Sequence, residues 1–77
     1  MLISPFKLVS EALECDEKSL NESSGLNNHA GWDSMGHLTI MMTLEKSYGI
    51  EINDKTINQF QSMAKIIALY NSLQKES

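Results

Sequence analysis

The chain has 77 residues, one cysteine, and ten acidic against six basic residues, which gives a net charge of −4. Its length predicts a single domain over residues 1–77 that is too small to enclose a deep catalytic cleft, which argues against an enzyme, and the lone Cys15 excludes an internal disulfide. The acidic balance disfavours nucleic acid and anionic membranes as partners, and the lack of a signal peptide or of roughly 20 consecutive apolar residues predicts a cytoplasmic protein without a membrane span.

The first predicted helix runs from about Pro5 to Glu14. Ser4 precedes it as an N-cap, and a proline at the first helical position loses no hydrogen bond, because its missing N–H would have no partner there. Apolar residues at helical spacing predict one buried face, made of Phe6, Val9, Ala12 and Leu13.

A long loop is predicted from Cys15 to Asp33, because this stretch is rich in asparagine, serine and glycine. A loop of this length is uncommon in a small domain and more often serves a function than a mere connection. Its apolar residues are expected to pack into the core; they are Leu20, Leu26 and Trp32.

The second helix is predicted to begin at a cap formed by Asp33 or Ser34 and to end at Gly49, with Lys46 in its last turn. Met42 is expected to project off the main apolar stripe of this helix. The stripe itself is predicted to comprise Leu38, Met41, Leu44 and Tyr48, with Ile40 beside them.

Two further helices complete the predicted fold. After an extended connector at residues 50–52, Asp54 is expected to cap a short helix that carries Ile57 and Phe60, and Ser62 to cap a last helix. Apolar faces on every helix and the lack of a strand pattern predict an all-α fold, a small four-helix bundle of three main helices and one short helix, with the long loop between helices one and two. The stripe of the last helix is predicted to comprise Met63, Ile66, Ile67 and Tyr70.

Ser34 lies where an irregular polar stretch turns into an amphipathic helix, in the run Gly31–Leu38. At a helix N-terminus its hydroxyl is expected to face water, and no base stands beside it in sequence to make it a nucleophile of its own. A serine of this kind is typical of a residue that another enzyme modifies.

The run Asp33-Ser34-Met35 and the segment Leu44–Ile52 carry a resemblance to a known family. Acyl carrier proteins have an Asp-Ser-Leu attachment motif and a similar helix-ending segment with an aromatic residue, a glycine and isoleucines. The likeness extends from Trp32 to about Leu73, so the chain resembles a freestanding member of this family over more than half its length.

The resemblance implies that a phosphopantetheinyl transferase moves 4′-phosphopantetheine from coenzyme A onto Ser34, with the help of Mg²⁺. A helix N-terminus suits the phosphate of this group, because backbone N–H groups and the helix dipole favour negative charge. The terminal thiol would carry an acyl group as a thioester to partner enzymes, namely loading ligases, acyltransferases and synthases. The domain, expected to be a monomer, would itself catalyse nothing.

Four neighbours of Ser34 have expected roles. Asp33 caps the helix and, by resemblance, helps the transferase to place Mg²⁺ or the serine. Met35 and Met42 are expected to contact partner proteins, since methionine adapts to varied surfaces, with peripheral packing as the alternative for Met35. His37, three residues after Ser34, is expected either to contact the phosphate or a partner, or to be a solvated helix residue.

The second helix differs from that of fatty-acid carriers, which is typically strongly acidic, because it holds one acid and one base between Met35 and Lys46. Weaker charge steering favours a dedicated carrier in a specialised pathway, such as a secondary metabolite, a glycan or an unusual lipid, over general fatty acid biosynthesis. The Asp-Ser-Met variant also resembles D-alanyl and peptidyl carriers, so an aminoacyl cargo is the alternative. A non-carrier interaction module, with the Asp-Ser pair as a plain cap, is the remaining interpretation.

Neither a metal site nor a hydrolase is predicted. His29 and His37 with Asp33 are too few and too loosely spaced for a metal, and nothing suggests an oxyanion hole for a Ser–His pair. The core that could open to an acyl chain is predicted to comprise Leu38, Ile40, Met41, Leu44, Ile52, Phe60, Met63 and Ile67.

Overall fold

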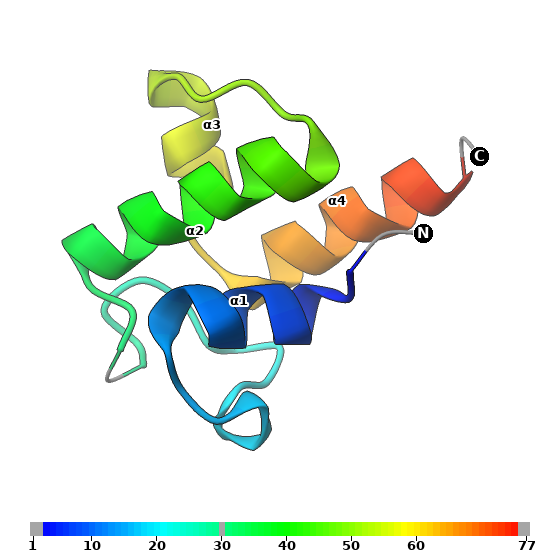
Figure 1. Ribbon diagram of the computed structural model, residues 1–77. Helices are drawn as coiled ribbons and strands as arrows, with labels where there is room; N and C mark the ends of the chain where they lie inside the picture. Colours follow the sequence, from blue (N-terminus) through cyan, green and yellow to red (C-terminus); the bar gives the residue numbers. More distant parts are fainter. Residues whose placement is uncertain (1–2, 30, 76–77) are drawn as a thin grey trace.

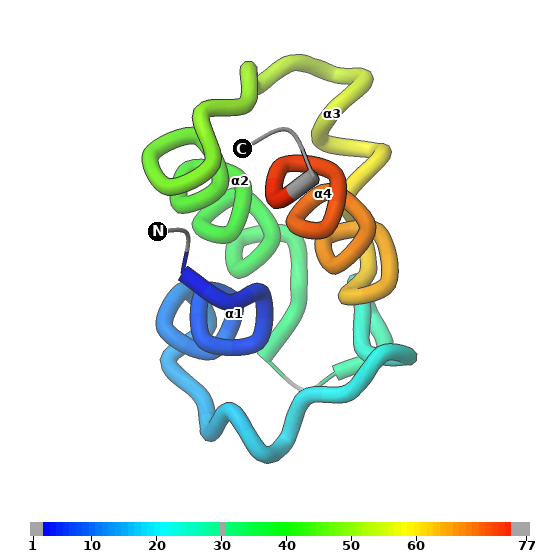
Figure 2. The backbone as a smooth tube through the Cα atoms, turned by 90° about the vertical axis from the view of Figure 1, so that its right-hand side faces the viewer, coloured from blue at the N-terminus to red at the C-terminus, as the bar shows by residue number. Residues whose placement is uncertain are grey.

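The computed structural model describes residues 3–29 and 31–75, and in them it confirms the all-α prediction. The elements are α1 (Pro5–Leu13), a 3-10 turn η1 (Glu17–Ser19), α2 (Ser34–Tyr48), α3 (Asp54–Gln59) and α4 (Met63–Lys75). Helices α1 and α2 run in opposite directions, and α4 lies beside them (Figure 1). The view along these three helices shows them grouped around one core, with α3 to one side (Figure 2).

Helix α1 begins as predicted, with Ser4 accepting a hydrogen bond from the N–H of Lys7 at 3.3 Å. It ends one residue earlier than expected, because Glu14 adopts a left-handed conformation with φ of 54°. Its core face differs in part from the prediction. Val9 is buried, but so is Leu8, which the sequence analysis did not assign to that face, and the predicted members Phe6, Ala12 and Leu13 are half-buried.

Helix α2 ends at Gly49 as predicted, since this glycine has φ of 72° and donates its N–H to Glu45 O at 3.1 Å. The predicted stripe is wrong at Leu38, whose side chain is 52% exposed. Its place on the buried face is taken by His37. The remaining buried residues of the helix were all predicted to lie on or beside the stripe; they are Ile40, Met41, Leu44 and Tyr48.

Over residues 15–29 and 31–33, the predicted long loop holds no helix longer than η1, and it is joined to the start of α4. Leu26 N–H donates to Gln61 O, and Met63 N–H donates to Ser24 O, each at 2.8 Å. Gly25 is required at this contact, because a Cβ there would lie 2.8 Å from Gln61 O. The loop packs into the core as expected through buried Leu20 and Trp32 and half-buried Leu26.

Helix α3 is capped by Asn53, so the expected cap at Asp54 is wrong by one residue. Asn53 and Thr56 form a reciprocal capping box, in which Asn53 Oδ1 accepts from Thr56 N–H at 2.9 Å and Thr56 Oγ1 accepts from Asn53 N–H at 3.0 Å. No side chain of α3 is buried. This short helix is therefore attached to the bundle by few contacts of its own.

Helix α4 begins at the predicted cap, since Ser62 Oγ accepts from Lys65 N–H at 3.4 Å. Of the predicted core residues outside α2, Phe60 and Met63 are buried, whereas Ile52 and Ile67 are half-buried. Among residues 3–29 and 31–75, no helix has both the length and the apolar character needed to cross a bilayer.

Tyr48 connects the end of α2 to the segment before α1. Its hydroxyl donates to Ile3 O at 2.7 Å, and its ring centroid lies 6.0 Å from that of Tyr70. Burial, and secondarily the charge of a Tyr70 phenolate, raises the pKa of Tyr48 to about 12 from its ordinary value of 10.0. The folded state therefore favours the protonated phenol.

We expect the unfolding free energy to fall as the pH rises from about 10 to about 12, because the unfolded chain releases the Tyr48 proton first. Tyr48→Phe should be about 1 kcal/mol less stable near neutral pH, since Ile3 O loses its donor. The same variant should lose stability less steeply over the alkaline range. Urea titrations followed by circular dichroism at a series of pH values measure both effects, and equal alkaline slopes would contradict this assignment.

Candidate functional site

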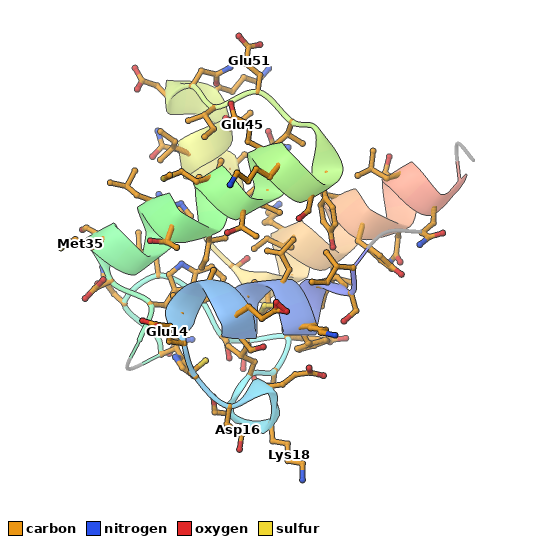
Figure 3. The ribbon with its side chains drawn as sticks, viewed as in Figure 1. Glu14, Asp16, Lys18, Met35, Glu45 and Glu51 are labelled. Carbon is orange, nitrogen blue, oxygen red and sulfur yellow. The ribbon has the colours of Figure 1, made fainter. Side chains whose placement is uncertain are left out.

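Ser34 is the first residue of α2, and its side chain is exposed, as the sequence predicts. The start of α2 lies at the opposite end of the molecule from the start of α1 and the end of α4 (Figure 1). Met35, the next residue, lies at the outer tip of this end, and Glu14, which directly follows α1, lies at the same end (Figure 3). The serine is therefore held on a regular helix at one pole of the bundle.

Asp33 caps α2, as expected. Its Oδ1 accepts a hydrogen bond from Gly36 N–H at 2.8 Å, and its carbonyl oxygen accepts from His37 N–H at 2.8 Å. Its side chain is exposed and lies directly before Ser34. The cap fixes the first turn of the helix and leaves a negative charge at the helix N-terminus, where the dipole stabilises it.

Gly36 permits close packing beneath the serine. A Cβ at this position would lie 2.6 Å from Gly31 O and 2.8 Å from Leu13 Cδ2. The loop backbone and a side chain of α1 therefore contact the first turn of α2 directly. Sequence reasoning did not single out Gly36, although a glycine inside a helix costs about 1 kcal/mol relative to alanine and often marks such a contact.

His37 is buried, with 3% of its surface exposed, so both expectations for it are wrong: it is neither a solvated residue nor exposed to contact a phosphate or a partner. Trp32 Nε1–H donates to His37 Nδ1 at 3.1 Å, and His37 Nε2 lies 2.7 Å from Ile57 O. The indole N–H can only donate, so Nδ1 must accept. The neutral ring therefore carries its proton on Nε2 and donates it to Ile57 O.

This pair of hydrogen bonds joins three separate parts of the chain. Trp32 belongs to the loop, His37 to the first turns of α2, and Ile57 to α3. The Trp32 and His37 rings also stack, with centroids 6.2 Å apart and planes at 25°. Helix α3 has no fully buried side chain, although Ile57 is half-buried against the core, and the bond to Ile57 O adds a polar attachment of α3 to the site.

The exposed large apolar side chains of the described residues all lie on α2. Met35 is 80% exposed, Met42 60% and Leu38 52%. The exposure of Met35 and Met42 agrees with the expectation that they are available to partners, and Leu38 joins them. Peripheral packing, the alternative for Met35, does not fit an exposure of 80%.

A second serine, Ser19, lies beside a histidine, but the geometry does not make it a nucleophile. His29 Nε2 is 3.0 Å from Ser19 Oγ, while His29 Nδ1 accepts from Gly31 N–H at 3.2 Å. The neutral ring therefore has its proton on Nε2 and donates to Ser19 rather than accepting from it. The Ser19 hydroxyl in turn donates to Asp16 O at 2.7 Å, so the contact holds the loop.

Across residues 3–29 and 31–75, no three His, Cys, Asp or Glu side chains gather as metal ligands.

A shallow cleft of about 300 Å³ lies between the end of α3 and α4, and no residue of α2, which begins at Ser34, lines it. Only one of the residues predicted to open to an acyl chain, Phe60, lines it. The lining comprises Gln59, Phe60, Lys65, Ala68, Leu69 and Ser72.

Residues 6–70 match the family described as "Phosphopantetheine attachment site". An acyl carrier protein of Treponema denticola is 29% identical over 69 residues, which cover 90% of this chain and 88% of that protein. One from Phytoplasma australiense is 28% identical over 60 residues, 78% of this chain and 79% of that protein. The mitochondrial acyl carrier protein of Neurospora crassa is 33% identical over 52 residues, which cover 68% of this chain but only 39% of that protein.

The chain belongs to the acyl carrier protein family, because the family match spans most of its length and includes the whole of α2. The cofactor of this family is 4′-phosphopantetheine, attached covalently to the protein. Acyl carrier proteins are non-catalytic carriers that work with transferases and synthases.

Removal of the buried histidine tests the link between the loop, α2 and α3. His37→Ala should lower the unfolding free energy by about 3 kcal/mol, because the Trp32 N–H and the Ile57 carbonyl both lose their partner inside the protein. Leu38→Ala, at the adjacent exposed position, should change it by less than about 0.5 kcal/mol. Urea denaturation followed by circular dichroism provides the comparison, and similar losses in the two variants would show that the hydrogen bonds contribute little.

Proposed function

We propose that this member of the acyl carrier protein family carries acyl intermediates as thioesters on a 4′-phosphopantetheine arm attached to Ser34, in a specialised biosynthetic pathway. The observation that carries the assignment of the residue is the position of Ser34. It is an exposed serine, the first residue of a 15-residue helix, directly after the capping aspartate and inside the matched region 6–70.

The surroundings of Ser34 fit a phosphate ester. The first N–H groups of a helix have no acceptor within the helix, and the helix dipole favours an anion there. The turn is held from below by the contacts of Gly36 and from the side by the Asp33 cap, so the Ser34 oxygen leaves from a rigid point. When attached, the arm supplies a terminal thiol that forms the thioester with the cargo.

The chain's own residues act by position and by charge. Ser34 presents its hydroxyl to the transferase, which forms the phosphodiester bond at this oxygen as the phosphoanhydride bond of coenzyme A breaks, the hydroxyl proton is lost and adenosine 3′,5′-bisphosphate leaves. Asp33 orients the first turn through its cap, and its exposed carboxylate can also help the transferase to hold Mg²⁺ or the serine. Rigid attachment at one pole of the molecule keeps the cargo at a high local concentration for successive enzymes, a ligase or acyltransferase that loads the arm and a synthase that uses it.

The composition of α2 supports a specialised pathway over the general synthesis of fatty acids. The single acid and the single base of α2, Glu45 and Lys46, lie next to each other in its last turns. From Ser34 to Leu44 the helix carries no Asp, Glu, Lys or Arg, so a partner gains little by charge attraction at the serine. Secondary metabolites, modified glycans and unusual lipids are the pathway classes that fit a dedicated carrier.

An aminoacyl cargo is the second candidate. Met35, which follows the serine in place of the usual leucine, resembles the motif of D-alanyl and peptidyl carriers. Incubation of the arm-bearing protein with amino acids and an adenylating ligase, followed by intact mass, separates the two cargo classes.

Attachment of the arm is tested by intact-protein mass spectrometry after incubation with coenzyme A, Mg²⁺ and a broad-specificity phosphopantetheinyl transferase. The wild type should gain one phosphopantetheinyl group. Ser34→Ala should gain none, whereas Ser19→Ala, which removes another exposed serine beside a histidine, should be modified like the wild type. No gain by folded wild-type protein, with a transferase active on another carrier, would refute the proposal.

The two roles of Asp33 are separable by substitution. Asp33→Asn should keep the stability within about 0.5 kcal/mol, because asparagine caps a helix as well as aspartate does. If the carboxylate assists the transferase, the same variant should lower kcat/KM for attachment of the arm by tenfold or more. Unchanged kinetics would limit Asp33 to capping.

A further inference from the structure

We propose that His37 selects the cargo of this carrier, because its hydrogen bond to Ile57 O keeps the core between α2 and α3 closed to an acyl chain attached through Ser34. The cargo that fits a closed core is a short or polar acyl group, aminoacyl groups included, which remains in water at the end of the arm. This inference rests on the function proposed above for Ser34. It narrows the cargo to a chemical class and assigns the selection to a residue inside the protein.

The buried side chains nearest to Ser34 in sequence carry hydrogen-bonding groups. Trp32, two residues before the serine, and His37, three residues after it, are the first buried side chains on either side. Their rings stack, and the indole N–H donates to the imidazole. The fully buried aliphatic side chains of α2 begin only at Ile40. An acyl chain that enters beside the first turn of α2 therefore meets this pair of rings before it reaches the apolar core.

The second bond of the imidazole joins α2 to the end of α3. His37 Nε2–H donates to Ile57 O at 2.7 Å. Helix α3 ends at Gln59, so Ile57 O is one of its last carbonyls, which have no N–H partner within the helix. His37 supplies that partner from the neighbouring helix, as histidine side chains can do at a helix C-terminus. Moving α3 away from α2 would break this bond.

A hydrocarbon chain cannot replace the bond, since it has neither a donor nor an acceptor. It gains free energy in proportion to the apolar area that it buries, so roughly two or three methylene groups would have to enter only to offset the separated donor and acceptor. A cargo of that length or shorter gains nothing by entering. A cargo with hydroxyl, amine or carboxyl groups would also lose its hydration. Short and polar cargos therefore stay outside.

For a longer chain, the space behind the two rings is already occupied. The side chains there have no exposed surface and belong to one cluster; they are Ile40, Met41 and Leu44 of α2 with Met63 and Ile66 of α4. Protein interiors are packed about as densely as organic crystals, so an entering chain must displace its neighbours. Room is made most easily by an outward movement of α3, which lies to one side of the other helices and has no fully buried side chain (Figure 2). This is the movement that His37 opposes.

The test compares acetyl and octanoyl forms of the protein, made with a broad-specificity phosphopantetheinyl transferase from the two acyl coenzymes A and verified by intact mass. Hydroxylamine in neutral buffer attacks the thioester carbonyl and releases the free thiol and a hydroxamate, so its rate reports whether the cargo is exposed to water. Each rate is divided by that of the free pantetheine thioester of the same acyl group. For the wild type we expect relative rates that agree within twofold for the two cargos, and the same midpoint of urea denaturation.

Two substitutions separate the bond to α3 from the bond to the indole. The amide oxygen of His37→Asn can still accept from Trp32, but this side chain is too short to reach Ile57 O. His37→Gln is longer and can bring an amide N–H to Ile57 O. We expect the octanoyl form of His37→Asn to be cleaved at least fivefold more slowly than its acetyl form, and to unfold at a higher urea concentration. His37→Gln should behave like the wild type, and circular dichroism verifies that each variant is folded.

The outcomes separate this inference from the proposed function. Wild-type octanoyl protein that is protected fivefold or more would overturn the inference and leave the carrier assignment intact. Equal rates for the two cargos in His37→Asn would overturn the role of His37, and protein that accepts no arm from either acyl coenzyme A would refute the carrier function itself. Proton NMR of protein labelled with nitrogen-15 follows the Nε2–H of His37 without any variant. Its signal should persist in the wild-type octanoyl form, and its loss there would also overturn the inference.

Discussion

The arrangement of the site depends on the buried imidazole of His37, which accepts from the Trp32 indole and donates to the Ile57 carbonyl. Both partners are polar groups inside or at the edge of the core, and leaving either of them without a hydrogen bond would cost free energy. A histidine meets both needs at once, because its neutral ring is a donor on one nitrogen and an acceptor on the other. The loop, α2 and α3 are thereby fixed relative to one another a single turn below Ser34.

The rigidity of the serine follows from this interaction together with two others in the same turn. The Asp33 cap satisfies the N–H of Gly36, and the absence of a side chain on Gly36 admits the Gly31 carbonyl and the Leu13 methyl group. These contacts come from α1, through Leu13, and from the loop, through Gly31 and Asp33. The outward face of the turn is left to Ser34 and Met35, both exposed, so the packing that fixes this turn does not obstruct the proposed point of attachment.

Much of the fold could be predicted from the sequence, because helix caps and apolar spacing are local signals. Ser4, Ser62 and Gly49 begin or end their helices as expected. The predicted cap of α3 is wrong by one residue. Asn53 and Asp54 are both good capping residues, and only the reciprocal bonds with Thr56 decide between them. The contacts of Gly36 and of His37 join segments far apart in sequence, and no local pattern specifies such partners.

One error in the prediction is informative about function. Residues 37, 41, 44 and 48, spaced four, three and four apart, follow the helical period better than 38, 41, 44 and 48, but the apolar character of leucine favoured position 38. The structure inverts that choice, with a histidine inside at 37 and a leucine outside at 38. Local departures from hydrophobic patterning are expected where a sequence serves more than folding. Here the buried histidine has a structural cause, the hydrogen bond to Ile57 O in α3, whereas Leu38 is 52% exposed among the described residues. The exposed leucine lies between two exposed methionines on the helix that begins at Ser34, the proposed point of attachment, so this surface is open to proteins that bind from outside.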